Sequence, residues 1–290
     1  MVTKTENRKL GDDMSVGIVG YGKLGQYLAK KIQDGAGMSI GFIYNRTPDK
    51  IREDFKDDSV PILGKIEEVA DYAKRVDLIL EVAHPKVSEE QACVWLEHCH
   101  VCVGSPTCFA GPEFYEQVQK TCNVTGYSCF VPAGALWGGP DIRKMADLGI
   151  CEKVSVTMKK APGSLRLACP ELQKLLESVK DTPGEHVIFD GEVSELAFKA
   201  PNNVNTMACA AIAAGSFEKT RAKLCVDKDL EFHIIDVEVQ GPGGFVVNST
   251  RKNPAGKQDV TGRLTLDSFY SSLALSKELS LSKPAGLHLC

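Results

Sequence analysis

Short apolar segments alternate with amphipathic segments along the first half of the chain. Runs of apolar residues predict strands at 16–19, Met38–Tyr44, 60–63, 76–82, 101–103 and 124–131. Apolar residues at helical spacing predict helices at 24–32, 66–73, 86–97 and 113–120. This regular alternation is typical of the α/β class, so we expect a doubly wound parallel sheet with right-handed crossovers that ends near Pro132.

The second half of the chain has a different pattern. Helices are predicted over 135–148, Pro170–Val179 and 204–214, and strands over 153–159, 187–189, 231–239 and 245–248. The Gly-Pro-Gly-Gly loop at 241–244 predicts a hairpin between the last two strands. Strands grouped apart from helices indicate an α+β domain over 134–262, which is the expected site of substrate binding and of contact with a second copy. A last helix over 263–279 is expected to fold back onto the first domain.

Composition and charge exclude several classes of partner. The 290 residues are 43% hydrophobic and 25% charged, with a formal net charge of −4. That balance offers no basic surface for nucleic acid or for an anionic membrane. No run of 18 apolar residues is present, and residues 1–13 lack the apolar core of a signal peptide, so we expect a flexible extension there and a cytoplasmic protein.

Eleven cysteines need a separate interpretation. Six residues form a local cluster of thiols and imidazoles: Cys93, His98, Cys99, His100, Cys102 and Cys108. The CxxC at 99–102 resembles half of a zinc or redox site, but no second CxxC follows it. The favoured interpretation is that these are buried thiols in a reduced protein and that no metal is bound, with the metal or redox site as the alternative.

The most specific motif is Gly20-x-Gly22-x-x-Gly25, placed between the first predicted strand and the first predicted helix. Gly20 permits the tight turn, Gly22 lets a pyrophosphate approach the backbone, and Gly25 lets helix and strand pack closely. The helix N-terminus offers free N–H groups and a partial positive charge to phosphates. We therefore expect a dinucleotide-binding Rossmann domain over 14–133, with Lys23 and Leu24 also at the cofactor.

The end of the second strand bears on the choice between NAD and NADP. A carboxylate that binds the ribose 2′-hydroxyl is expected there, and the chain has Asn45-Arg46-Thr47 instead. Arg46 offers a planar cation suited to a 2′-phosphate, with Asn45 beside it. The alternative is that Arg46 is a solvated loop residue. We expect both cofactors to be used, with a preference for NADP.

Two further loops end strands on the same edge of the sheet. One holds Ala83 in the turn at 83–85, which follows Glu81, and the other spans 104–107. Ligands bind at the carboxyl edge of such sheets. Either loop can contact the nicotinamide, and Ala83 is the residue expected to do so. The alternative is that the loops only reverse the direction of the chain.

Glycine-rich and asparagine-rich segments mark the boundary between the two predicted domains. Residues 132–141 hold three glycines around Ala135, a pattern that indicates close approach of backbone to a ligand or to other backbone. Asparagine occupies 202, 203 and 205 at the start of a predicted helix. One asparagine suffices for an N-cap, so at least one of the three is expected to face a ligand.

His233 lies in the predicted strand 231–239 on the same face as Ile235, Val237 and Val239. A lone histidine on an apolar strand face is commonly a hydrogen-bonded core residue. The alternative is an imidazole at a dry cleft, where it can activate water near neutral pH.

Four motifs in order, GYGKLG, VPAGALWGGPD, APNNVN and EFHIIDVEVQG, give the chain a resemblance to the L-aspartate dehydrogenase family, its animal members in particular. The resemblance spans roughly residues 14 to 280. In that family a serine-glycine-alanine-isoleucine-glycine-glycine stretch and an asparagine motif contact cofactor and substrate, and a downstream histidine is catalytic. The resemblance implies these roles for Ala135, Asn203 and His233.

The chain departs from the family pattern at three positions, where Ala133 replaces a serine, Trp137 precedes the glycine pair and Asn202 replaces a lysine. The resemblance implies NAD(P)-dependent oxidation of L-aspartate through iminosuccinate to oxaloacetate and ammonia, with His233 as acid/base and helix N-termini at Ala135 and Asn203 supplying a positive field. The alternatives are a reductase of a semialdehyde or cyclic imine and a non-catalytic NAD(P)-binding protein. A homodimer is expected.

Overall fold

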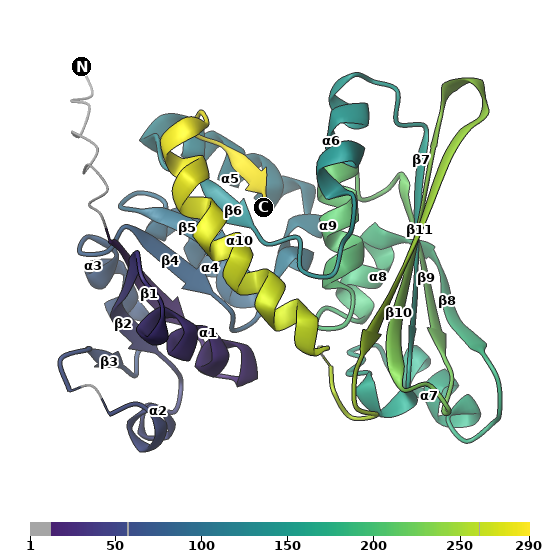
Figure 1. Cartoon of the computed structure of the whole chain (residues 1–290), viewed down its shortest axis with the longest axis horizontal. Helices are drawn as coiled ribbons and strands as arrows, with labels where there is room; N and C mark the ends of the chain where they lie inside the picture. The colour runs from purple at the N-terminus through teal and green to yellow at the C-terminus, as the bar shows by residue number, and fades with distance from the viewer. Residues whose placement is uncertain (1–12, 57, 261) are drawn as a thin grey trace.

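The computed structural model describes residues 13–290 except 57 and 261. The expected flexible extension over 1–13 therefore falls almost entirely outside the described residues. Two sheets, each covered by helices, lie side by side (Figure 1). None of the helices that the described part of the chain forms is long and apolar enough to cross a membrane.

The first sheet has seven strands, all paired in parallel, in the order β12-β6-β5-β4-β1-β2-β3. Their bounds are β1 Met14–Val19, β2 Met38–Tyr44, β3 Ile62–Leu63, β4 Leu78–Glu81, β5 His100–Val103, β6 Cys129–Val131 and β12 Leu287–Leu289. The expected doubly wound parallel sheet is confirmed. The strand order reverses between β1 and β4, and at such a switch point these sheets bind their ligands.

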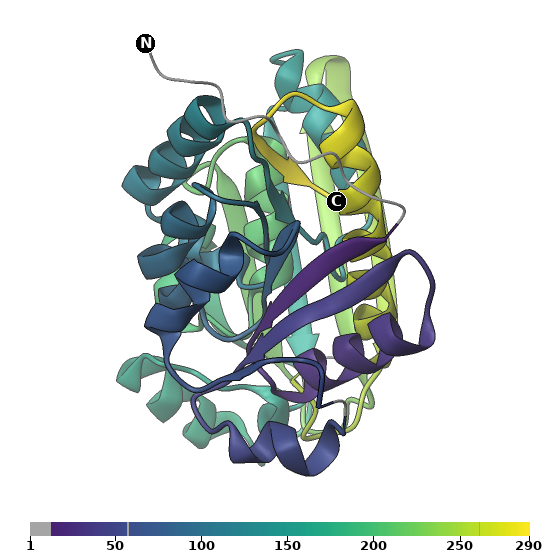
Figure 2. The ribbon, with the colours of Figure 1, turned by 90° about the vertical axis from the view of Figure 1, so that its left-hand side faces the viewer.

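Helices cover both faces of this sheet. On one face α1 (Lys23–Asp34) and α10 (Arg263–Ser282) pack through Leu28, Ile32, Phe269 and Leu273. The other face carries α3 (Val69–Ala73), α4 (Pro85–Trp95) and α5 (Pro112–Thr125). Figure 2 shows β1 and β2 in front, with the second sheet behind them. The chain therefore returns from the second sheet to the first before it ends, through α10 and β12.

The second sheet is mixed, in the order β11-β10-β7-β9-β8. Its strands are β7 Lys153–Lys160, β8 His186–Glu192, β9 Thr220–Val226, β10 Phe232–Gly241 and β11 Phe245–Pro254. The helices that precede or cover it are α6 Gly139–Asp147, α7 Pro170–Val179, α8 Val193–Lys199 and α9 Asn205–Ala214. The predicted hairpin is confirmed, because β10 pairs antiparallel with β11 across 242–244.

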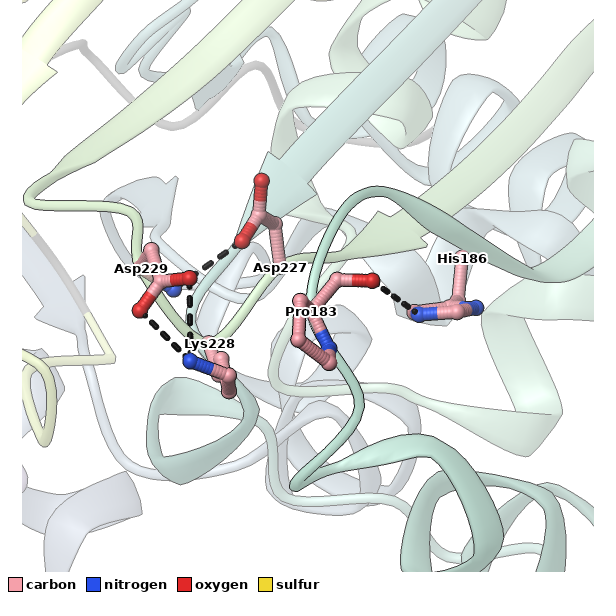
Figure 3. A network of polar contacts seen from close by, with 5 residues as sticks. All are labelled: Pro183, His186, Asp227, Lys228 and Asp229. Atoms are coloured by element: carbon pink, nitrogen blue, oxygen red, sulfur yellow. Dashed lines mark hydrogen bonds and ion pairs between the residues drawn. The ribbon is translucent and has the colours of Figure 1, made fainter.

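A short turn links β9 to β10 at the edge of the molecule (Figure 3). The Asp229 N–H donates to the Asp227 carboxylate over 2.9 Å, and Lys228 Nζ lies 2.9 Å from an Asp229 carboxylate oxygen. The turn sets the start of β10, the strand that carries His233.

Several predicted boundaries are shifted in the structure, and glycine explains two of them. Residues 124 and 125, predicted as strand, end α5 instead, and Gly126 caps that helix with φ +81°. The helix predicted from 135 begins only at Gly139, after Gly138 turns the chain at φ +79°. Left-handed backbone of this kind favours glycine, which therefore sets where each helix can end or begin. The elements α2 (Asp49–Asp54), α8, β9 and β12 were not predicted.

Candidate functional site

A cleft opens between the two sheets, at the carboxyl edge of the first. Its lining comes from α1 (Leu24), the loop after β5 (Gly104), the 132–135 segment, the start of α9, and the buried face of the second sheet. It encloses about 670 Å³ of empty space, part of it open to solvent.

The three glycines of the loop after β1 occupy the positions that a dinucleotide requires. Gly20 has φ +109°, and a Cβ there would lie 2.9 Å from the Ala83 backbone. A Cβ on Gly25 would lie 2.1 Å from the Gly20 carbonyl oxygen. A Cβ on Gly22 would meet no described atom within 4 Å. The loop thus packs tightly on its inner side and leaves Gly22 facing open space, where a pyrophosphate can approach.

The helix that follows this loop begins without a side-chain cap. Gly22 is the N-cap residue of α1 and offers no capping oxygen, so the first N–H groups stay available to an anion. Lys23 extends from the first turn, with its side chain 88% exposed, and its Nζ lies 2.9 Å from Asp259 Oδ1. This ion pair joins the loop of the first sheet to the segment that follows β11.

Asn45 and Arg46 stand next to the glycine loop. The Asn45 Oδ1 accepts a hydrogen bond from the Tyr21 backbone N–H over 3.4 Å, and its Nδ2 donates to the Thr47 carbonyl over 3.1 Å. Asn45 therefore holds the loop in place. Arg46 is exposed and forms no ion pair with any described residue, so its guanidinium is available to a ligand.

Glu81 forms hydrogen bonds with both of the loops at 83–85 and 104–107, which the sequence analysis considered either as nicotinamide contacts or as simple turns. Its buried carboxylate accepts hydrogen bonds from the backbone N–H groups of Ala83 (2.6 Å) and His84 (2.9 Å) and from the hydroxyls of Ser88 (2.6 Å) and Ser105 (3.2 Å). Burial raises the pKa of Glu81, and these four donors oppose that rise. The carboxylate thus fixes both loops beside the glycine turn.

The 132–135 segment reaches the cleft as a turn, not as a helix start. Gly134 has φ +61°, and its carbonyl accepts hydrogen bonds from Ser268 Oγ (2.8 Å) and Arg251 Nη1 (3.3 Å). Ala135 lines the cleft and is 7% exposed. Because α6 begins four residues later, the expected helix N-terminus at Ala135 is wrong.

The asparagines at 202–205 were expected to supply one helix cap and at least one ligand contact, and the structure gives Asn203 and Asn205 different roles. Asn203 lines the cleft, but its Oδ1 accepts from the Arg166 N–H over 2.6 Å and its Nδ2 donates to the Ser164 carbonyl over 3.0 Å. Its amide therefore holds the 164–166 loop. The helix N-terminus lies at Asn205, two residues later than expected, and the buried Asn205 Oδ1 has no hydrogen-bond partner among the described residues.

His233 lies where the strand pattern placed it, on the buried face of β10 with Ile235, Val237 and Val239. It lines the cleft, is 5% exposed, and its Nε2 has no hydrogen-bond partner among the described residues. Burial, together with the nearby Lys160 charge, lowers the pKa of His233 to about 4. The backbone and the charge of Asp259 act in the opposite direction and raise this pKa, but by less. The imidazole is therefore neutral at pH 7 and can accept a proton.

Two cleft residues were missed by the sequence reasoning. Lys160 continues the buried side of β7, in register with Val154, Val156 and Met158, and is 3% exposed. A lysine at a buried position of an alternating strand is a signal that the sequence already carried. Asn253, at the end of β11, donates from Nδ2 to Thr265 Oγ1 over 3.0 Å and leaves Oδ1 without a described partner. No motif marked that residue.

The site residues fall into two groups in space. The cleft brings together four of them, Leu24, Ala135, Asn203 and His233. The remaining candidates, Gly20, Gly22, Lys23, Gly25, Asn45, Arg46 and Ala83, lie around the glycine loop at the ends of β1, β2 and β4. This division fits an elongated ligand whose phosphates lie at the loop and whose reactive end enters the cleft.

Three cysteines of the cluster, Cys99, Cys102 and Cys108, lie in the core, and Cys93 is half-buried. Cys99 and Cys102 are at most 1% exposed, and burial raises the pKa of both thiols. Among the described residues no three His, Cys, Asp or Glu side chains gather as metal ligands. The structure thus agrees with the interpretation of these cysteines as small apolar core residues.

Both parts of the chain match known family models. Residues 20–132 match a model described as homoserine dehydrogenase, NAD binding domain, and residues 141–276 match one described as aspartate dehydrogenase, C-terminal. An aspartate dehydrogenase domain-containing protein of Danio rerio is 40% identical over 271 residues, which cover 91% of this chain and 95% of the relative. An L-aspartate dehydrogenase of Methanococcoides burtonii is 28% identical over 267 residues, 90% of this chain and 96% of the relative.

Solved structures share the fold. The crystal structure of aspartate dehydrogenase from Thermotoga maritima matches with a TM-score of 0.67 at 21% identity, covering 93% of this chain and 97% of that one. A dihydrodipicolinate reductase from Paenisporosarcina matches with a TM-score of 0.53 at 16% identity, covering 96% and 97%. At these identities the likeness concerns the architecture alone.

Proposed function

This chain belongs to the aspartate dehydrogenase family, and on that premise we propose that it catalyses the NAD(P)-dependent oxidation of L-aspartate. The observation that carries the proposal is His233, a buried imidazole in the cleft that adjoins the glycine loop, whose Nε2 has no hydrogen-bond partner in the described part of the chain. Archaeal relatives that cover nine-tenths of the chain are L-aspartate dehydrogenases, which supports the same substrate here.

The chain's own residues fit a nicotinamide dinucleotide. Gly22 faces open space, the N-terminus of α1 is not capped by a side chain, and Glu81 fixes the Ala83 loop beside Gly20. When bound there, the nicotinamide supplies a hydride acceptor. Lys23, Leu24 and Gly25 complete the contacts that we propose for the cofactor.

The proposed reaction has two stages. L-Aspartate loses a hydride from its α-carbon and a proton from its amine, which leaves iminosuccinate. Water then adds to the imine carbon, and release of ammonia gives oxaloacetate. The cleft holds the substrate and keeps bulk water out during the first stage.

His233 is proposed as the general base that activates the water. Its pKa of about 4 leaves the imidazole neutral at neutral pH. In the tautomer that carries the proton on Nδ1, Nε2 can take a proton from a water molecule as that water attacks. Asn205 and Asn253 both line the cleft, and each has a buried Oδ1 to which no described residue donates. Either oxygen can accept a hydrogen bond from the substrate amine or from the nicotinamide amide. We assign ligand contact to Asn205, and to Asn203 through the loop that it positions.

We propose that NADP is preferred over NAD. Arg46 is exposed beside Asn45, and the segment 44–47 that ends and follows β2 has no Asp or Glu where an NAD site places one. The guanidinium fits a phosphate through two parallel hydrogen bonds. NAD is expected to bind more weakly, through contacts at the glycine loop alone.

The reaction is tested by following reduced-nicotinamide absorbance at 340 nm with L-aspartate and either oxidised cofactor. Turnover with aspartate, at a higher kcat/KM for NADP, supports the proposal. Tight cofactor binding by calorimetry without turnover of any amino acid would instead identify a non-catalytic binding protein. Turnover of a semialdehyde or cyclic imine in preference to aspartate would assign a related reduction to the same cleft.

We further propose a homodimer located in the cytoplasm. The edge strand β11 exposes three apolar residues in succession, Phe245 (47%), Val246 (49%) and Val247 (46%), which a second copy would cover. Buried thiols such as Cys102 and Cys129 suit a reducing compartment. A fluorescent fusion that concentrates in an organelle would contradict the location.

A further inference from the structure

Lys160 is a buried cation without a counter-ion in the described part of the chain. Its side chain enters the cleft from the last position of β7 and is 3% exposed. The partners of its Nζ are two neutral carbonyl oxygens, those of Asn203 at 3.2 Å and Val260 at 3.4 Å. Both distances are long for hydrogen bonds to an ammonium group.

Such an arrangement is costly for the protein alone. An ammonium group removed from water loses several kcal/mol of solvation, and two neutral acceptors at these distances return only part of it. Burial accordingly lowers the pKa of Lys160 to about 8, so the group is still mostly charged at pH 7. An anion that enters the cleft would supply the missing stabilisation.

The surroundings of Lys160 limit what that anion can be. Of the described residues that line the cleft, Lys160 is the one with a charged side chain at neutral pH, because His233 is neutral there. The phosphates of a dinucleotide belong at the glycine loop, on the first sheet. The anion at Lys160 therefore belongs to the second ligand, whose reacting atoms meet His233.

We propose that Lys160 binds a carboxylate of the substrate and thereby selects acidic substrates for this cleft. The inference rests on the proposed function and names one residue responsible for its substrate class. With L-aspartate bound, the ammonium and one substrate carboxylate neutralise each other inside the cleft, next to the His233 imidazole. A neutral ligand of the same shape leaves the ammonium unpaired.

A purely structural role is the competing explanation, since Lys160 also connects the Asn203 and Val260 backbones to β7. Substitution Lys160→Gln separates the two roles, because a glutamine amide can still donate to both carbonyls but carries no charge. Lys160→Met removes charge and donors together. Lys159→Gln is the matched control: its residue is adjacent in β7 but faces the other side of the sheet, where it pairs with Glu185 at 2.8 Å.

The experiment measures binding of succinate and of its neutral analogue succinamide by calorimetry, on the full chain with saturating NADPH and no turnover. Wild type is expected to bind succinate more tightly than succinamide by on the order of 10- to 100-fold, as for a hydrogen bond between charged groups. Lys160→Gln and Lys160→Met should lose most of that preference, and Lys159→Gln should keep it. The melting temperatures of the two Lys160 variants without ligand should not fall, because an uncompensated charge has been removed.

Two results would overturn the inference: no succinate preference in wild type, or a preference that survives in Lys160→Gln. A Lys160→Gln protein that melts lower and also loses NADPH binding would assign the residue a structural role and would likewise overturn it. The outcome is independent of the aspartate assay. If the preference for succinate depends on Lys160 but aspartate is not oxidised, the inference about Lys160 holds and the proposed function fails. If Lys160→Gln oxidises aspartate with an unchanged KM, the inference fails and the proposed function holds.

Discussion

Arg46 is the residue on which the proposed cofactor preference rests. Replacing it with alanine removes the one cation beside Asn45 at the end of β2 and should weaken NADP binding by about 1.5–3 kcal/mol, typical of a hydrogen bond to a charged group. NAD binding should stay nearly unchanged, because NAD has no phosphate at that position. Dissociation constants for both cofactors measure the effect.

Arg52→Ala is the control for that substitution. Arg52 is an exposed arginine on the neighbouring α2, paired with Asp49 at 3.1 Å. Its loss should leave both dissociation constants unchanged. Equal weakening of NAD and NADP in Arg46→Ala, or a wild type that favours NAD, would contradict the assignment.

Lys160 also gives substrate binding a defined pH dependence. Below about pH 8 its ammonium is charged and attracts a carboxylate, and above that pH the charge is lost. The other titratable groups of the cleft keep their state over this range, because burial lowers the pKa of His233 to about 4 and raises that of Cys209. Succinate affinity should therefore be level from pH 6 to 7 and decrease through pH 8 to 9.

Calorimetry at four pH values tests this, with Lys160→Gln expected to give one affinity throughout. Succinate is the better probe than aspartate because it has no amine that titrates in the same range. An affinity in wild type that does not change up to pH 9 would show that the Lys160 ammonium does not hold the carboxylate.

Single residues show where sequence reasoning stops. The alternation of β10 placed His233 on the buried face correctly, because period-2 geometry depends on local sequence alone. The asparagine motif could not show that the Asn203 amide is taken up by the 164–166 loop, since that contact joins residues 37 apart or more. Lys160 was identifiable in principle, because the alternation of β7 places this charged residue on the buried side of the strand.

At the scale of elements, Glu81 connects the end of β4 to the loops that face the cofactor. Glu81→Ala leaves two backbone N–H groups and two hydroxyls without their acceptor and should lower the free energy of unfolding by about 3 kcal/mol. Denaturant unfolding measures the loss, and weaker cofactor binding should accompany it.

Glu90→Ala is the matched control on α4. Glu90 pairs with Lys86 at 3.6 Å on an exposed helix face, and such pairs contribute at most about 1 kcal/mol. Its unfolding midpoint should stay close to that of wild type. Equal midpoints for the Glu81 and Glu90 variants would show that the buried carboxylate does not hold the loops.

The elements were predictable to the extent that local pattern decides them. The strands of the first sheet other than β12, and also α7, follow from apolar runs and helical spacing. The end of α5 and the start of α6 depended on left-handed turns at Gly126 and Gly138, which the apolar pattern does not reveal. β9 was missed because its pairing with β7 and β8 is formed by distant residues.

For the whole molecule, the proposed homodimer rests on the exposed apolar row on β11. Light scattering should give about twice the 31.4 kDa chain mass. Val246→Lys should reduce it to the chain mass, while Val124→Lys, at a valine 76% exposed on α5, should leave it unchanged. A monomer mass for wild type at micromolar concentration would rule out the dimer.

The overall architecture was predictable because alternating strands and helices permit few topologies. The return of the chain through α10 to the first sheet follows from packing of Phe269 and Leu273 against β1, β4 and β5. The cleft itself was not predictable, since its lining combines Leu24, His233 and Thr265 from segments far apart in the sequence.

His233→Ala tests most directly whether this cleft is a catalytic site. Turnover of L-aspartate should fall by on the order of 10²- to 10⁴-fold while the NADPH dissociation constant and the unfolding midpoint stay nearly unchanged. His186→Ala, at a surface histidine that contacts the Pro183 carbonyl at 3.2 Å (Figure 3), should retain wild-type turnover. Equal turnover in His233→Ala and wild type, or a parallel loss of stability, cofactor binding and activity, would contradict a catalytic role for the imidazole.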